Sequence, residues 1–155
     1  MKKEDIFNKL RSSGLRPTKQ RVEIAKFLFE REKTFHFTVE SLNKLLAKKT
    51  NFKFALATIY NTVHAFKAAG HLSEVEVRGN KSYFDTNVSN HHHFYDSETS
   101  ELIDIDANEV VIQKIPKAPN GKKIKNVEVF INLKNWQIVA CFHFRIIINW
   151  IIIWV

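Results

Sequence analysis

The chain has 155 residues, a length that suits one domain of ordinary size or two small ones. Hydrophobic residues make up 45% of it and charged residues 26%, a composition that excludes a disordered chain. The single cysteine, Cys141, excludes an intrachain disulfide and a CxxC zinc knuckle, and it suits a reducing compartment. Because the N-terminal segment MKKEDIFNKL lacks the apolar core of a secretory signal, we predict a cytoplasmic protein.

The net charge of +8 is distributed unevenly along the chain. Residues 1–84 contain 17 Lys and Arg against 8 Asp and Glu, whereas residues 85–155 contain 7 against 8. Such an excess belongs either to a solvated basic face or to a surface that binds nucleic acid. The second interpretation gives the front half of the chain a polyanionic partner and leaves the back half another task.

Apolar residues recur at helical spacing through the front half of the chain. The pattern predicts helices over residues 4–13, 19–30, 39–49 and 55–69. Thr18 and Thr38 stand where N-terminal caps are expected, and Gly14 stands where the first helix should stop.

The last of these helices has two contrasting faces. One face carries an apolar stripe that we expect to be buried, formed by Leu56, Ile59, Val63 and Phe66. The other face carries no acid and consists of small and hydrogen-bonding residues between two larger ones: Ala57, Thr58, Asn61 and Ala65, flanked by Tyr60 and Lys67. This second face is typical of a helix that lies close against another surface.

A β-hairpin with a basic tip is predicted directly after the helices. LSEVEV at 72–77 and KSYFD at 81–85 alternate apolar and polar residues on either side of the turn from Arg78 to Lys81. Helices followed by a hairpin form a winged helix-turn-helix, in which the last helix enters the major groove and the hairpin contacts the DNA backbone. We therefore predict a DNA-binding domain over residues 1–85.

A second, smaller domain is predicted over residues 86–134. A polar stretch at 86–100 precedes two predicted strands, 101–105 and 127–133, with a short helix around Asn108–Lys114. The predicted fold class is therefore α+β. Because so few elements bury little area alone, we expect this domain to pair with a second copy as a dimerisation domain.

The last segment, residues 135–155, is an atypical apolar tail. From Trp136 to Val155, 16 of 20 residues are apolar, which is long enough to span a bilayer. Arg145 near its centre costs roughly 2.5–3.5 kcal/mol on insertion, and no basic cluster flanks the segment, so a membrane anchor is disfavoured. A membrane anchor, a packed tail and an altered reading frame at the end of the gene all remain open interpretations.

Three stretches of the chain resemble the ferric uptake regulator family, between about Ile6 and Leu133. They are GLRPTKQR at 14–21, LATIYNTVHAF at 56–66 followed by AAG, and GNKSYFD at 79–85 followed by three histidines. The resemblance implies a dimeric bacterial repressor with an N-terminal winged helix and a C-terminal α+β dimerisation domain. The run HHHFY, followed by ELIDI without cysteine pairs, looks most like the haem-sensing iron response regulator branch.

The resemblance also implies which residues contact an operator, expected to be a pseudo-palindromic, AT-rich duplex. Tyr60 matches a recognition-helix tyrosine that contacts thymine methyls and phosphate, and Arg16 matches a basic residue that enters the adjacent minor groove. Asn61 stands where many members have arginine, so the base preference can differ. Alternatively, Tyr60 packs at the helix edge and Arg16 is merely solvated. The predicted DNA-binding set is Arg16, Ala57, Thr58, Tyr60, Asn61 and Lys81.

A metal site is predicted at the junction of the two domains. In an extended strand His91 and His93 point the same way and can hold one metal ion. The resemblance adds His36 and Asp85, which gives a mixed nitrogen and oxygen set suited to Fe²⁺, Zn²⁺ or Mn²⁺. An ion bound by both domains would fix the angle between the DNA-binding units. Haem bound by His91, His92 and His93 is a weaker alternative.

Two family features are absent, namely paired CxxC motifs for a structural zinc and an N-terminal Cys-Pro motif for haem. The predicted function is a homodimeric transcriptional regulator of iron homeostasis that responds to iron or haem. The alternatives are a Zn-, Mn- or peroxide-responsive regulator of the same family and a tail-anchored membrane variant. We predict that the chain is not an enzyme, because it has no Ser/His/Asp order, Gly-rich phosphate loop or HExxH motif.

Overall fold

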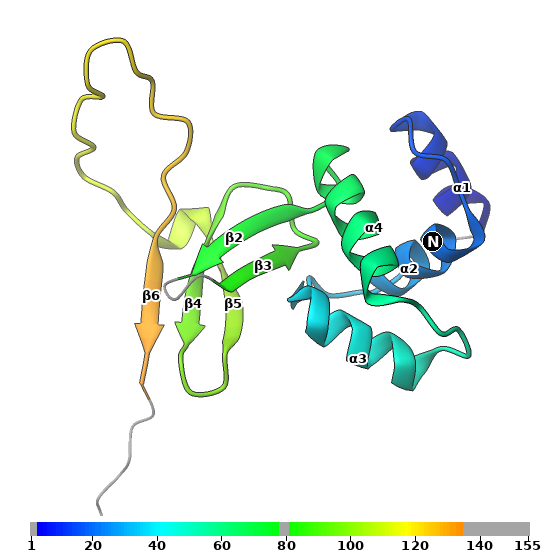
Figure 1. The fold of residues 1–155 in the computed structure, drawn as a ribbon. Helices are drawn as coiled ribbons and strands as arrows, with labels where there is room; N and C mark the ends of the chain where they lie inside the picture. The colour runs from blue at the N-terminus through cyan, green and yellow to red at the C-terminus, as the bar shows by residue number, and fades with distance from the viewer. Residues whose placement is uncertain (1–2, 78–80, 135–155) are drawn as a thin grey trace, which may run out of the picture. The chain divides into compact units, whose positions relative to one another are not determined.

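The computed structural model describes residues 3–77 and 81–134 (Figure 1). The chain forms two compact units, Met1–His91 and His92–Val155, which are described separately. No helix in the described ranges is long and apolar enough to cross a bilayer. The apolar tail predicted at 135–155 lies outside the described residues, as does Cys141.

The first unit begins with the helices that the hydrophobic pattern predicts: α1 (Lys3–Ser12), α2 (Lys19–Phe29), α3 (Val39–Lys49) and α4 (Leu56–Ala68). Thr18 caps α2 by accepting a hydrogen bond from Arg21 N at 3.3 Å. Thr38 and Ser41 form a reciprocal capping box at the start of α3. Gly14, with φ of +76°, ends α1 in the left-handed conformation that glycine adopts without steric cost. The predicted caps and the predicted stop are confirmed.

The core of this unit lies between the helices and one strand of a small sheet. Its buried members are Ile6, Leu10, Val22, Ile24, Ala25, Leu28, Phe37, Val39, Leu42, Leu46, Ile59, Val63, Phe66, Leu72 and Phe84. The prediction for α4 was correct for three of its four stripe residues. It was wrong for Leu56, which is 47% exposed, because this first residue of α4 lies beyond the edge of the core. Thr62 is buried instead, at 4% exposure.

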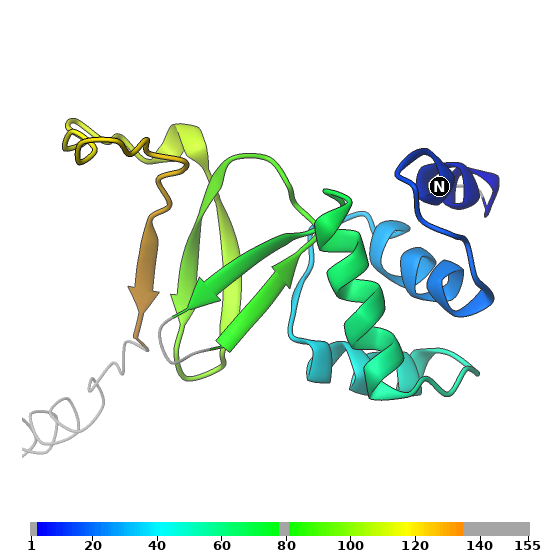
Figure 2. The ribbon, with the colours of Figure 1, turned by 45° about the horizontal axis from the view of Figure 1, so that its top comes forward.

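A three-stranded sheet completes the first unit, in the order β1-β3-β2. Strands β2 (Ser73–Val77) and β3 (Lys81–Asp85) form the predicted antiparallel hairpin, whose tip at 78–80 lies outside the described residues. Strand β1 (His36–Phe37) pairs antiparallel with β3 and was not predicted. Figures 1 and 2 show α4 between α2 and the hairpin strands.

Two side-chain contacts hold α4 to this sheet. The ring of His64 contacts that of Phe84 edge-on, with centroids 5.4 Å apart. Lys67 forms an ion pair with Glu74 at the start of the hairpin, and its hydrogen bond lowers the pKa of that carboxyl below the usual range. The helix and the hairpin are therefore held together by side-chain contacts.

The second unit contains a sheet of order β5-β4-β6, with strands β4 (His91–Asp96), β5 (Glu101–Asp106) and β6 (Phe130–Leu133). Strand β4 begins at the last residue of the first unit and pairs in parallel with β6. The helix predicted at Asn108–Lys114 was wrong, since only one 3-10 turn, Ala107–Glu109, forms there. The β-branched run from Val110 to Ile112 disfavours a helix, and residues 110–129 instead form a long excursion from the sheet (Figures 1 and 2).

Candidate metal centre and DNA-binding surface

Pairing between β1 and β3 places His36 directly opposite Asp85. The pairing continues for one more residue, because Phe35 N donates to Thr86 Oγ1 at 2.9 Å and Thr86 N donates to Phe35 O at 3.3 Å. These two hydrogen bonds join segments 51 residues apart in the chain. They explain how a two-residue strand can hold a histidine in a defined position.

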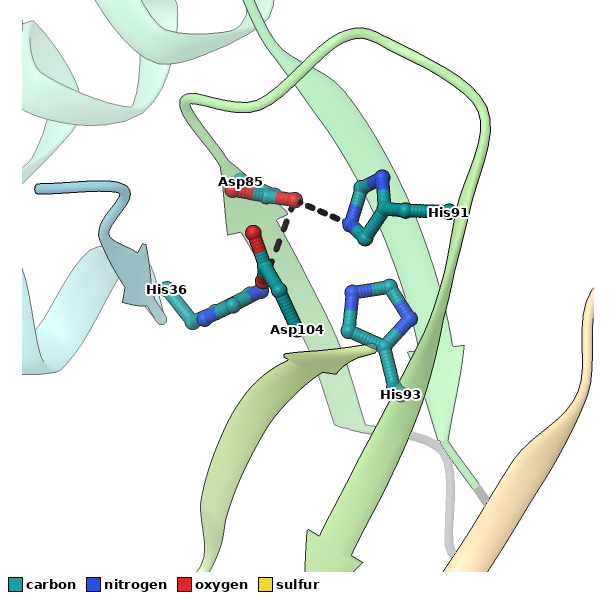
Figure 3. A group of neighbouring side chains, drawn as sticks. All are labelled: His36, Asp85, His91, His93 and Asp104. Atoms are coloured by element: carbon teal, nitrogen blue, oxygen red, sulfur yellow. Dashed lines mark ion pairs between the residues drawn. The ribbon is translucent and has the colours of Figure 1, made fainter. Parts of the chain in front are cut away.

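The Asp85 side chain is fully buried, and its two oxygens have different partners. Oδ1 accepts a hydrogen bond from Asn87 N at 2.8 Å. Oδ2 lies 3.0 Å from Nε2 of His91 and 3.4 Å from Nε2 of His36. Figure 3 shows these contacts as dashed lines from one carboxylate oxygen to both rings. The backbone thus fixes the carboxylate with one oxygen while the other is directed at two imidazoles.

The orientation of His91 is set by the loop that precedes it. Its Nδ1 lies 2.9 Å from the carbonyl oxygen of Ser89, which only accepts hydrogen bonds, so Nδ1 is the donor. The other ring nitrogen, Nε2, faces Oδ2 of Asp85 and is the nitrogen directed at the candidate site. Ser89 is itself held by Asn87, whose Oδ1 accepts from Ser89 N at 3.1 Å and Oγ at 2.6 Å. The preceding loop therefore orients the His91 ring so that Nε2 is directed at the candidate site.

In the second unit, His93 and Asp104 lie on the neighbouring strands β4 and β5, with ligand atoms within 4.8 Å of each other. Asp104 was not predicted from the sequence. The available signal was its position in ELIDID, where it alternates with Ile103 and shares a strand face with the buried Leu102. An acid on the apolar face of a strand requires a partner, so this position can indicate a ligand.

The donor atoms on each unit are imidazole nitrogens and carboxylate oxygens. This chemistry fits Fe²⁺, Mn²⁺ or Zn²⁺, and the carboxylates make it poorly suited to Cu⁺, which prefers thiolate and thioether ligands. Of the predicted metal ligands, the structure brings His36, Asp85 and His91 together within the first unit. His93 is nearly fully buried in the second.

The three consecutive histidines do not form one ligand set. His92 is buried, and its Nδ1 accepts a hydrogen bond from Val129 N at 3.3 Å. Strand alternation directs its side chain away from the face of His93. The prediction of haem bound by His91, His92 and His93 therefore has no support, because one of its three ligands is engaged with the backbone on the other face of β4.

The predicted DNA-binding residues are distributed around the exposed face of α4. Ala57, Tyr60 and Asn61 are exposed on that helix and Thr58 is half-buried. Tyr60 is 52% exposed, and its ring lies 4.2 Å from that of His64 between centroids. The remaining two residues, Arg16 before α2 and Lys81 at the start of β3, are also exposed. All six side chains lie at least partly open to solvent.

Helix α4 also differs from α2 and α3 at its N-terminus. Threonines cap those two helices, whereas Ala55 provides α4 with no side-chain hydrogen bond. The first amide groups of α4 are therefore not covered by a capping side chain. Such a helix end carries partial positive charge and can accept a phosphate.

Comparison with known proteins identifies the family. Residues 12–133 match the model of the ferric uptake regulator family. The chain belongs to this family. Its members are regulators, which agrees with the prediction that the chain is not an enzyme.

The family relatives include peroxide-responsive repressors of staphylococci. The chain is 32% identical to that of Staphylococcus saprophyticus over 101 residues, 65% of this chain and 66% of the repressor. It is 31% identical to that of Staphylococcus epidermidis, covering 65% of each. The matched region thus spans just under two thirds of these relatives' length.

Solved structures of the family share the fold. The ferric uptake regulator from Pseudomonas aeruginosa with manganese matches with a TM-score of 0.60 and 25% identity, over 84% of this chain and 97% of that one. The Vibrio cholerae ferric uptake regulator matches with a TM-score of 0.64 and 20% identity, over 83% and 98%. The predicted α+β fold of a winged helix followed by a small sheet-containing domain is confirmed.

Proposed function

We propose that this chain is a metal-responsive, sequence-specific transcriptional regulator that binds duplex DNA as a homodimer. The observation that carries the proposal is the joint presence, in one unit, of an acid-free exposed helix and a buried histidine–carboxylate group. Neither feature is needed to stabilise a small helical domain. Together they couple a DNA-binding surface to a metal ion.

The DNA interface of the proposal consists of α4 and the hairpin. The exposed face of α4 enters the major groove, where Tyr60 and Asn61 contact base edges, and Lys81 contacts a phosphate. Arg16 contacts the adjacent minor groove. The absence of acids on α4 and the uncapped start of that helix support this assignment, because both favour approach to a polyanion.

The metal site of the proposal takes donors from both units, namely His36, Asp85 and His91 from the first and His93 from the second, joined by Asp104. Strand geometry supports this set in addition to the chemistry of the donors. His91 and His93 occupy alternate positions of one strand, β4, so their side chains face the same way. The carboxylates of Asp85 and Asp104 would offset the charge of an ion held there, and the shared donors would restrict the angle between the units. With that angle restricted, the DNA-binding unit would lose less conformational freedom when it binds an operator. The metal-loaded form is therefore expected to bind the operator more tightly than the metal-free form.

We propose iron as the resident ion and peroxide as the signal that ends DNA binding. The support is the identity of 32% to a peroxide-responsive repressor, together with the mixed donor set. Zinc has no redox chemistry, so a peroxide response at this site requires a redox-active ion such as iron. The iron response regulator branch, to which HHHFY pointed, has less support than the peroxide response, since the similar staphylococcal repressors are peroxide-responsive.

A homodimer and a cytoplasmic location complete the proposal. The second unit exposes several large aliphatic side chains, which are Ile103, Val111, Ile112, Ile115, Ile124 and Ile131. Exposed apolar groups of this kind are typical of a surface that another copy covers. Two copies present two recognition helices and therefore favour a pseudo-palindromic operator.

The proposal is tested by fluorescence anisotropy on an AT-rich pseudo-palindromic duplex with a random-sequence duplex as competitor. We expect preferential binding when anaerobic Fe²⁺ or Mn²⁺ is supplied, with affinity that falls steeply as salt is raised. Hydrogen peroxide is expected to release the Fe²⁺-loaded protein and to leave the Zn²⁺-loaded protein bound. Equal affinity for both duplexes with every ion would refute the proposed function, and a response to haemin alone would favour the haem-sensing branch.

A further inference from the structure

The side chain and the backbone of His93 are held by contacts that lie within its own unit. Its Nδ1 lies 2.8 Å from Oε1 of Glu128. Its ring is stacked on Phe130, with centroids 5.6 Å apart and planes 16° from parallel. Its backbone N donates to Val129 O at 3.0 Å. The ring is thus fixed in plane and direction, and its side chain is only 1% exposed.

The position of Glu128 is fixed by the residue that follows it. Both backbone groups of Val129 form hydrogen bonds to β4. Its carbonyl accepts from His93 N, and its amide donates to Nδ1 of His92. The parallel pairing of β4 with β6 continues from there with His93 opposite Phe130. Glu128 is also the one acid in residues 110–134, a stretch with six lysines. Backbone pairing of the next residue therefore holds the Glu128 carboxylate beside His93, and no neighbouring acid in this stretch could take its place.

The contact at Nδ1 determines what the other ring nitrogen can do. The negative charge of the Glu128 carboxylate, 2.8 Å away, favours the proton on Nδ1 and so leaves the lone pair on Nε2. A carboxylate in this position also makes the imidazole a stronger donor to a metal ion. For His91 the equivalent partner is the uncharged carbonyl of Ser89. The two histidines of β4 thus have the same ligand nitrogen but different outer partners.

We infer that Glu128 is a positioning residue for the metal site, which orients His93 and raises the affinity of that histidine for the ion. The inference rests on the proposed function, because it requires His93 to be a ligand. It adds a residue that does not touch the metal but sets the tautomer of one that does. It also makes the segment that leads into β6 part of the sensor, since this segment carries the carboxylate into place.

The test compares Glu128→Ala and Glu128→Gln with Glu109→Gln, a control that removes one exposed charge from the same unit. Mn²⁺ and Zn²⁺ affinities of the full chain are measured by competition with a chromophoric chelator. We expect Glu128→Ala to weaken both about 10-fold, Glu128→Gln to weaken them less, and the control to leave them unchanged. The melting temperatures of the metal-free proteins separate this effect from a loss of folding.

A second readout needs no metal. Long-range ¹H–¹⁵N spectra report which nitrogen of His93 is protonated, and we expect Glu128→Ala to move that proton away from Nδ1. Metal affinities of Glu128→Ala within twofold of wild type, with an unchanged tautomer, would overturn the inference while leaving the proposed function intact. If the wild-type chain binds neither ion, the proposed function fails and this inference fails with it.

Discussion

Asp85→Asn is expected to lower the affinity of the chain for Mn²⁺ or Fe²⁺ by at least about 100-fold, or about 2.7 kcal/mol. The substitution keeps the size of the side chain and the oxygen that accepts from Asn87 N. It removes the charge of the buried carboxylate that faces His36 and His91. A neutral amide cannot neutralise a divalent ion at this position, so the loss should exceed that from changing an outer-shell partner. Equilibrium dialysis against each ion gives the measurement.

Asp106→Asn provides a closely matched control for this experiment. Oδ1 of Asp106 accepts from Asn108 N at 2.8 Å, the same local turn and the same distance as Asp85 makes with Asn87. Asp106 is exposed, however, and caps only the 3-10 turn after β5. We expect this variant to bind metal like the wild type. If both variants bind equally well, Asp85 is not a ligand and the proposed site is wrong.

Tyr60→Ala is expected to weaken binding to a specific duplex by about 1–3 kcal/mol, which is roughly 5- to 150-fold. Tyr60 is half exposed on the acid-free face of α4, so its removal leaves the buried core intact. Affinity for random DNA should change little, because phosphate contacts dominate that binding and tyrosine carries no charge. The measurement is anisotropy on specific and random duplexes at several salt concentrations.

Two further variants show which part of the interface is affected. Lys81→Ala should weaken both duplexes similarly and reduce the salt slope by about one unit, as expected for loss of one phosphate contact. Asn8→Ala, at an exposed neutral position on α1, should have no effect. An unchanged specific affinity for Tyr60→Ala, with the protein folded by circular dichroism, would show that α4 is not the recognition helix.

The helical half of the fold could be predicted because its signals are local. Apolar spacing located α1 to α4, and Thr18 and Thr38 both accept the cap hydrogen bonds expected of them. The hairpin of β2 and β3 followed from alternation over five residues on each side. The first strand, β1, has two residues and no periodicity, and it forms only because β3 pairs with it from 49 positions later in the chain. Local patterns cannot predict such a strand.

Only part of the candidate metal site could be predicted from the sequence. His91 and His93 follow from a spacing of two in an extended segment, whereas His36 and Asp85 required the family resemblance. Asp104 and Glu128 were missed, because a single acid in or beside a strand is ordinarily interpreted as a solvated residue. Only pairing of β4 with its neighbours on both sides places these acids beside His93. Residues that act through tertiary pairing cannot be identified from spacing.

The most direct test of the account is the affinity of the wild-type chain for Mn²⁺ measured with and without the specific duplex. If the ion and the operator are coupled, each must raise affinity for the other by the same factor, typically about 5- to 150-fold. A random duplex of equal length controls for ions attracted by DNA itself. Metal-dependent operator binding predicts tighter Mn²⁺ binding with the specific duplex only. The same Mn²⁺ affinity with the specific duplex, the random duplex and no DNA would contradict it.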